Sequence, residues 1–126
     1  MTNNYYVNCQ WLAGNLNHPQ IVIVECRFQL ASPTWGYDQY CLAHIPGAYY
    51  LDLDRDLSSP INLHGGRHPL PNLDQFATKL ASFGIVQSET LVVAYDDSRF
   101  AFASRLWWLL RYLGHDRIVL LDGGWN

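Results

Sequence analysis

The side chains most able to do chemistry in this sequence are its three cysteines, Cys9, Cys26 and Cys41. A thiolate is both a nucleophile and a metal ligand. The odd number of cysteines and the lack of a Cys-x-x-Cys pair argue against a disulfide framework and against a zinc site. Cys26 follows an apolar run that ends at Glu25, but Glu25 and Arg27 act on a thiolate in opposite directions. No activation of the Cys26 thiol can therefore be argued, so we interpret Cys26 as a small buried core residue, with a nucleophile at the carboxyl end of a strand as the alternative.

The histidines are the other candidates for metal binding or proton transfer. The five histidines are dispersed along the chain, and His64 and His68 are the only close pair. No cysteine or acidic cluster near that pair completes a set of metal ligands. The sequence therefore predicts neither a metal site nor a cofactor.

Composition excludes several classes of partner. A chain of 126 residues that is 49% hydrophobic and 15% charged is typical of one compact domain. Its net charge of −3 comes from eleven acidic and eight basic residues that form no basic stripe, so we expect no nucleic-acid or membrane partner. The polar, aromatic start of the chain does not resemble a signal peptide, and we expect a cytoplasmic location.

Elements that could position these side chains alternate along the chain. Continuous apolar runs predict short buried strands at Ile21 to Glu25, Ala48 to Leu51, Leu91 to Tyr95 and Ile118 to Leu121, with a weaker strand starting at Tyr5. Helical patterns lie between them. Asn8 caps the first, Asn72 and Gly84 bound the second, and the third runs from about Phe100 to Leu113. This alternation predicts an α/β domain with a mostly parallel sheet of about five strands and helices on both faces. Ligands in such folds bind at the carboxyl ends of the strands.

The segment from Tyr40 to Ala48, Tyr-Cys-Leu-Ala-His-Ile-Pro-Gly-Ala, is the sharpest motif. Its residues have a structural interpretation, since a residue before Pro46 is pushed to extended geometry and Gly47 permits a turn. We expect His44 to satisfy a backbone group beside that turn, with a catalytic role as the alternative.

This motif resembles the signature of the rhodanese family, and the resemblance extends over nearly the whole chain. It is specific to the first half of tandem rhodaneses, the thiosulfate and 3-mercaptopyruvate sulfurtransferases. The other matching segments are Val22 to Arg27, Asp52-Leu53-Asp54, His68-Pro69-Leu70-Pro71, Arg105 to His115 with its double tryptophan, and Leu121-Asp122-Gly123-Gly124-Trp125. The resemblance implies a rhodanese-like domain over residues 1–126, with His44, Pro46 and Gly47 as its signature residues.

One departure from the catalytic domains of the family is decisive. Those domains place a nucleophilic cysteine directly after the fourth strand, in a loop whose amides hold an anionic sulfur before a helix. Here that position is Asp96, and the non-catalytic first domains of the family likewise carry aspartate. We therefore expect no catalytic residue in this chain, and we expect Asp96 to satisfy the amides of the loop itself.

The resemblance also suggests a functional role for two residues of the long irregular segment, Asp54 and His68. By themselves, Asp54 and His68 are polar loop residues. In mercaptopyruvate-type members the matching pair faces the cleft and assists proton handling at the active site of the other domain, a task suited to an imidazole whose tautomer a carboxylate fixes.

The implied function is sulfurtransfer by a longer protein. A cysteine of a second, C-terminal domain would take sulfane sulfur from thiosulfate or 3-mercaptopyruvate and pass it to cyanide or another thiophile. We expect the partners to be these small molecules and that C-terminal domain, and we expect the final helix of the present domain to be truncated at Asn126. The alternatives are a stand-alone inactive rhodanese module that binds or regulates, and a single-domain enzyme that uses Cys26.

Overall fold

The structure is a computed structural model that describes residues 6–29, 32, 34–53, 56–58, 71–87, 89–97 and 101–122. Strands and helices alternate along these residues, as the apolar runs predict. In chain order they are β1 (Tyr6–Val7), α1 (Cys9–Ala13), β2 (Ile21–Glu25), α2 (Trp35–Leu42), β3 (Tyr49–Tyr50), α3 (Leu73–Ser82), β4 (Leu91–Tyr95), α4 (Ala103–Tyr112) and β5 (Ile118–Leu121).

The described strands form one five-stranded sheet with the order β1-β5-β4-β2-β3. Every pair of neighbours in it is parallel. The two central strands are in register from Ile21 opposite Leu91 to Glu25 opposite Tyr95. Their carboxyl ends therefore lie side by side. The predicted α/β class and mostly parallel sheet of about five strands are confirmed.

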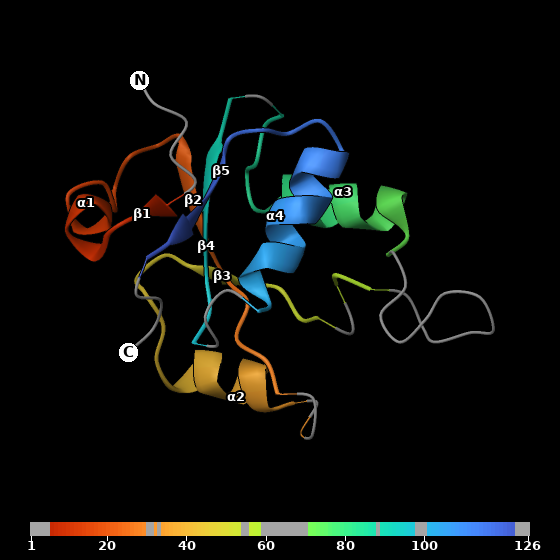
Figure 1. Cartoon of the computed structure of the whole chain (residues 1–126), viewed down its shortest axis with the longest axis horizontal. Helices are drawn as coiled ribbons and strands as arrows, with labels where there is room; N and C mark the ends of the chain where they lie inside the picture. The colour runs from red at the N-terminus through yellow and green to blue at the C-terminus, as the bar shows by residue number, and fades with distance from the viewer. Residues whose placement is uncertain are drawn as a thin grey trace.

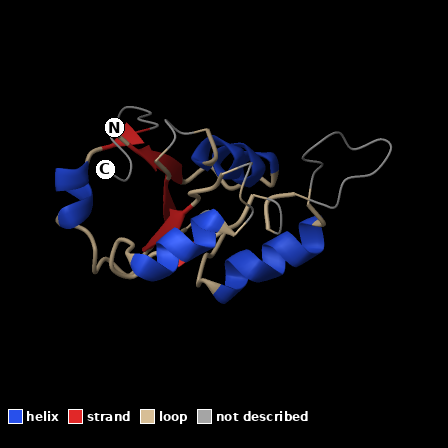
Figure 2. Ribbon diagram, turned by 90° about the horizontal axis from the view of Figure 1, so that it is seen from below, coloured by secondary structure: helices blue, strands red, loops and turns tan. Residues whose placement is uncertain are grey.

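Helices cover both faces of this sheet, with α1 on one side and α3 and α4 on the other (Figure 1). Figure 2 shows the same separation from below. Successive strand residues point to opposite faces, so the chain builds two apolar cores. The core under α3 and α4 includes Val22, Val24, Val92, Ala94, Leu106 and Leu110. The core under α1 includes Leu12, Ile23, Val93, Val119 and Leu121.

The ends of the helices follow local chemistry that the sequence displays. The side chain of Asn8 accepts a hydrogen bond from the Trp11 amide at the start of α1, and Asn72 accepts one from Gln75 at the start of α3. Gly84 and Gly114 follow α3 and α4 with φ values of +83° and +87°, the left-handed conformation in which helices commonly end. None of the helices in the described ranges is long and apolar enough to span a membrane.

One helix, α2, was not predicted. Its sequence, Trp-Gly-Tyr-Asp-Gln-Tyr-Cys-Leu, does not separate apolar from polar residues onto two faces, so no helical period is visible. Gly36 is nevertheless buried in it, packed so closely against the carbonyl of Arg27 and the hydroxyl of Tyr50 that any side chain there would overlap them. This close approach places α2 beyond the carboxyl ends of the central strands (Figure 1). The strand predicted over Ala48 to Leu51 is also shorter than expected, as β3 covers only Tyr49–Tyr50.

Candidate functional site

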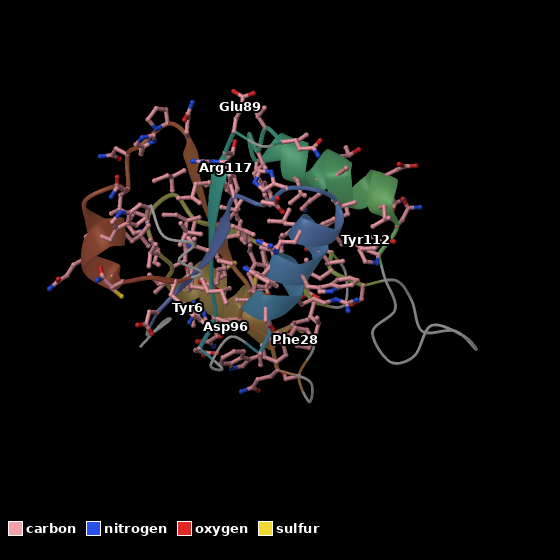
Figure 3. The ribbon with its side chains drawn as sticks, turned by 45° about the horizontal axis from the view of Figure 1, so that its top comes forward. Tyr6, Phe28, Glu89, Asp96, Tyr112 and Arg117 are labelled. Atoms are coloured by element: carbon pink, nitrogen blue, oxygen red, sulfur yellow. The ribbon has the colours of Figure 1, made fainter. Side chains whose placement is uncertain are left out.

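The carboxyl edge of the sheet brings together two of the residues that the sequence selects for chemistry, Cys26 and Asp96. Cys26 directly follows β2 and Asp96 directly follows β4, and the Cys26 amide donates to the Tyr95 carbonyl at 2.8 Å. Figure 3 shows Asp96 and Phe28 at this edge, with Glu89 and Arg117 at the opposite end of the strands. The edge is where open α/β sheets bind ligands.

Asp96 is buried, with 2% of its surface exposed. Its Oδ2 accepts hydrogen bonds from the backbone amides of Phe102 at 2.9 Å and Ala103 at 2.7 Å. These amides open α4, whose N-cap residue Phe102 makes no side-chain cap of its own. A carboxylate on the first amides of a helix also interacts favourably with the helix dipole. Asp96 therefore occupies a place that holds negative charge, and it offers no thiol for sulfur chemistry there.

The thiol of Cys26 is buried and resists ionisation. Its side chain lies in the core beneath α4, with 1% of its surface exposed. Burial raises the pKa of the thiol well above its ordinary value, and the carboxylates of Asp96, Glu25 and Asp56 raise it further. The sequence suggested that Arg27 offsets Glu25 at this thiol. Instead, burial and three carboxylates all raise the pKa of the thiol, and the guanidinium of Arg27 is paired with Glu25.

The remaining thiols, Cys9 and Cys41, are exposed on α1 and α2, and all three cysteines are free. Cys9 Sγ lies 3.9 Å from the carbonyl oxygen of Asp122. Within the described ranges, no group of three histidine, cysteine or acidic residues is arranged to hold a metal ion.

Sequence reasoning missed a buried polar network on the other face of the edge. Glu25 and Tyr95 have no exposed surface and Arg27 has 4%. Arg27 Nε forms an ion pair with Glu25 Oε2 at 2.9 Å, and Arg27 Nη2 donates to Glu25 Oε1 at 3.1 Å. The Tyr95 hydroxyl donates to the same Oε1 at 2.6 Å. The sequence did contain a hint of this network. Glu25 and Arg27 are two residues apart at the end of a buried strand, and residues at that spacing share a face.

The signature motif lies against this network. We call residues 43–48 the edge loop. The Ala43 carbonyl accepts from Arg27 Nη2 at 2.7 Å, and the Ile45 amide donates to the Tyr95 hydroxyl oxygen at 3.2 Å. The loop turns at Gly47, whose φ is +81°, and the Ala48 amide closes the turn on the Ile45 carbonyl at 2.9 Å.

The His44 side chain supports this turn by contacting a backbone carbonyl. Its Nδ1 lies 2.7 Å from the carbonyl oxygen of Tyr40, an acceptor, so Nδ1 carries the proton and donates. The imidazole also stacks on the Tyr40 ring with centroids 3.9 Å apart. The Tyr40 hydroxyl in turn donates to the Ala48 carbonyl. His44 thus ties the end of α2 to the edge loop.

The two residues suggested for proton handling, Asp54 and His68, lie outside the described residues. The structure does describe contacts between two nearby residues, Asp52 and Asp56. The Asp52 amide donates to Asp56 Oδ2 at 2.8 Å, and the Asp56 amide donates to the Asp52 carbonyl at 2.9 Å. The placement of the pair relative to Asp96 stays a prediction.

Fold and edge together are those of a rhodanese-like domain. Residues 8–126 match the family of the rhodanese-like domain, and the chain belongs to that family. It is 45% identical to a probable 3-mercaptopyruvate sulfurtransferase of Pseudomonas aeruginosa, over 98% of this chain and 44% of that protein. It is 33% identical to 3-mercaptopyruvate sulfurtransferase of Escherichia coli K12, over 98% of this chain and 43% of that protein. The chain therefore spans less than half the length of these relatives.

Solved structures agree with this assignment. The fold matches 3-mercaptopyruvate sulfurtransferase from Leishmania major with a TM-score of 0.86 at 31% identity, covering 98% of this chain and 33% of that one. It matches SseA from Escherichia coli with a TM-score of 0.73 at 29% identity, covering 97% of this chain and 46% of that one. These matches are consistent with an N-terminal rhodanese-type domain of a sulfurtransferase.

Proposed function

We propose that this chain is the N-terminal, non-catalytic domain of a sulfurtransferase. The whole protein would move sulfane sulfur from 3-mercaptopyruvate to a thiophile such as cyanide, through a persulfide on a cysteine of a second rhodanese-type domain. The names of the similar proteins support 3-mercaptopyruvate as the donor, and thiosulfate is the alternative. The free thiols support a reducing compartment, the cytoplasm.

The observation that carries the proposal is the state of Asp96. Sulfur transfer needs a thiolate where anionic sulfur is stabilised, and here a buried carboxylate occupies the first amides of α4. Cys26, which directly follows β2, has a raised pKa and 1% exposure. Both facts favour a nucleophile supplied from outside this chain.

The carboxyl edge would form one wall of the cleft between the two domains. Tyr37 and Leu42 of α2, at this edge, are 50% and 79% exposed, and large apolar side chains of this kind are commonly covered at interfaces within a protein. On this proposal Asp54 and His68 handle protons for the second domain. Replacing His68 by asparagine would then lower the turnover of the whole protein without unfolding this domain.

The direct test is an assay of the chain by itself. Purified protein is incubated with 3-mercaptopyruvate or with thiosulfate in the presence of cyanide, and thiocyanate is measured. We expect no enzymatic thiocyanate. Turnover by the unmodified chain that disappears in Cys26→Ala would overturn the proposal and assign the nucleophile to Cys26. The second test is the gene, whose reading frame should continue beyond Asn126 into a rhodanese repeat with a cysteine in the corresponding loop.

A further inference from the structure

The buried pair of Glu25 and Arg27 calls for an explanation beyond stability. Their side chains are 0% and 5% exposed. Removing two charges from water is costly, and apolar residues of similar volume often replace a buried ion pair without loss of stability. A buried ion pair has a clearer role where it favours one conformation of the chain over its alternatives.

The contacts of the network show which arrangement it selects. Arg27 reaches from Glu25 to the Ala43 carbonyl, and Tyr95 reaches from Glu25 to the Ile45 amide. Both outer contacts are to backbone atoms of the edge loop. Pro46 has no amide hydrogen, so the Ile45 amide is the last backbone donor before the turn. A side chain on the sheet satisfies that donor.

Glu25 sets the direction of these hydrogen bonds. A carboxylate accepts only, so the Tyr95 hydroxyl must donate its proton to Glu25 Oε1 and present oxygen lone pairs to the Ile45 amide. The same carboxylate orients the guanidinium of Arg27, whose Nη2 also donates to the Ala43 carbonyl. We propose that Glu25, Arg27 and Tyr95 are positioning residues that hold the edge loop in register with the carboxyl ends of β2 and β4. The sheet and its two apolar cores form without them.

Amide hydrogen exchange, resolved by residue, tests this division. Tyr95→Phe keeps the ring and removes the hydroxyl that binds the Ile45 amide. Exchange at Ile45 should accelerate by about tenfold or more, the loss expected for one hydrogen bond, while the amides of Val22, Val24 and Val93 keep their protection. Tyr50→Phe is the matched control, because its hydroxyl also binds a backbone group, the Arg27 carbonyl at 2.8 Å, without contacting the Ile45 amide.

A double variant separates positioning from stability. Glu25→Leu combined with Arg27→Met replaces the ion pair by apolar side chains. Like the unmodified chain, it should unfold cooperatively, but its Ile45 and Ala48 amides should exchange rapidly. Unchanged protection at Ile45 in Tyr95→Phe would overturn the proposal. So would a double variant that fails to fold, or uniform acceleration of strand and loop amides. None of these rates depends on whether the whole protein transfers sulfur.

Discussion

Glu25 and Asp96 are both buried carboxylates at the carboxyl ends of neighbouring strands, but different groups satisfy them. Asp96 is held by two backbone amides that open α4. Glu25 is held by the side chains of Arg27 and Tyr95. Backbone amides at the start of a helix stabilise many anions, a thiolate among them. The amides at the start of α4 could therefore hold another anionic group in place of the Asp96 carboxylate. The Glu25 side is specific to one carboxylate, since its partners are themselves fixed by further contacts.

The largest effect on stability should come from removing one partner of Glu25 from the side-chain network. Arg27→Met leaves the Glu25 carboxylate buried without its cation, which we expect to cost about 3–5 kcal/mol of unfolding free energy. Urea denaturation measures it. A loss below about 1 kcal/mol would contradict the role of Arg27 as the compensating cation of this carboxylate.

The next largest effect should come from Gly36, which lets α2 approach the same network. In Gly36→Ala the new methyl group overlaps the Arg27 carbonyl and the Tyr50 hydroxyl, so α2 must shift. Overpacking of this kind costs about 1–3 kcal/mol. Gly14→Ala is the control, because a side chain at Gly14 meets its nearest atom, the carbonyl oxygen of Trp11, at an ordinary 3.6 Å. Equal thermal stability of the two variants would contradict the close approach.

A smaller loss should follow from removing the other carboxylate. Asp96→Ala deprives the amides of Phe102 and Ala103 of their acceptor. The loss of a capping side chain costs about 0.5–2 kcal/mol. Asp116→Ala, which removes an exposed carboxylate, should change stability by less than about 0.5 kcal/mol. If both variants unfold at the same urea concentration, Asp96 contributes no more than a surface charge.

The smallest perturbation is the most informative about function. A thiol introduced by Asp96→Cys inherits the amides of α4, so its pKa should fall below about 8.5, the value for a free cysteine. Cys9→Ser and Cys41→Ser remove the exposed thiols first, and thiolate absorbance is then followed against pH. Cys26 should stay protonated throughout, because its pKa is raised. An ordinary pKa for the new thiol would mean that the loop is not built to hold an anion.

Local features of the chain were predicted well for a physical reason. Apolar runs, capping asparagines and helix-ending glycines act within a few residues, so Ile21 to Glu25, Asn72 and Gly84 could be interpreted directly. α2 was not predicted, because its sequence has no apolar stripe and its burial depends on Gly36 packing against the distant carbonyl of Arg27. Asp96 was singled out by its place in a family motif, but the amides that it holds were known only once the start of α4 was placed.

The sequence by itself determined the alternation of strands and helices, the parallel sheet, and the absence of a cysteine after β4. Only the tertiary structure decided which groups satisfy the buried charges. Tyr95 and Glu25 are 70 residues apart, and nothing local to either residue indicates the other. A buried carboxylate must find partners wherever the fold brings donors within reach. Parallel pairing of β2 with β4 in register brings these two residues together, and that pairing is a property of the whole domain.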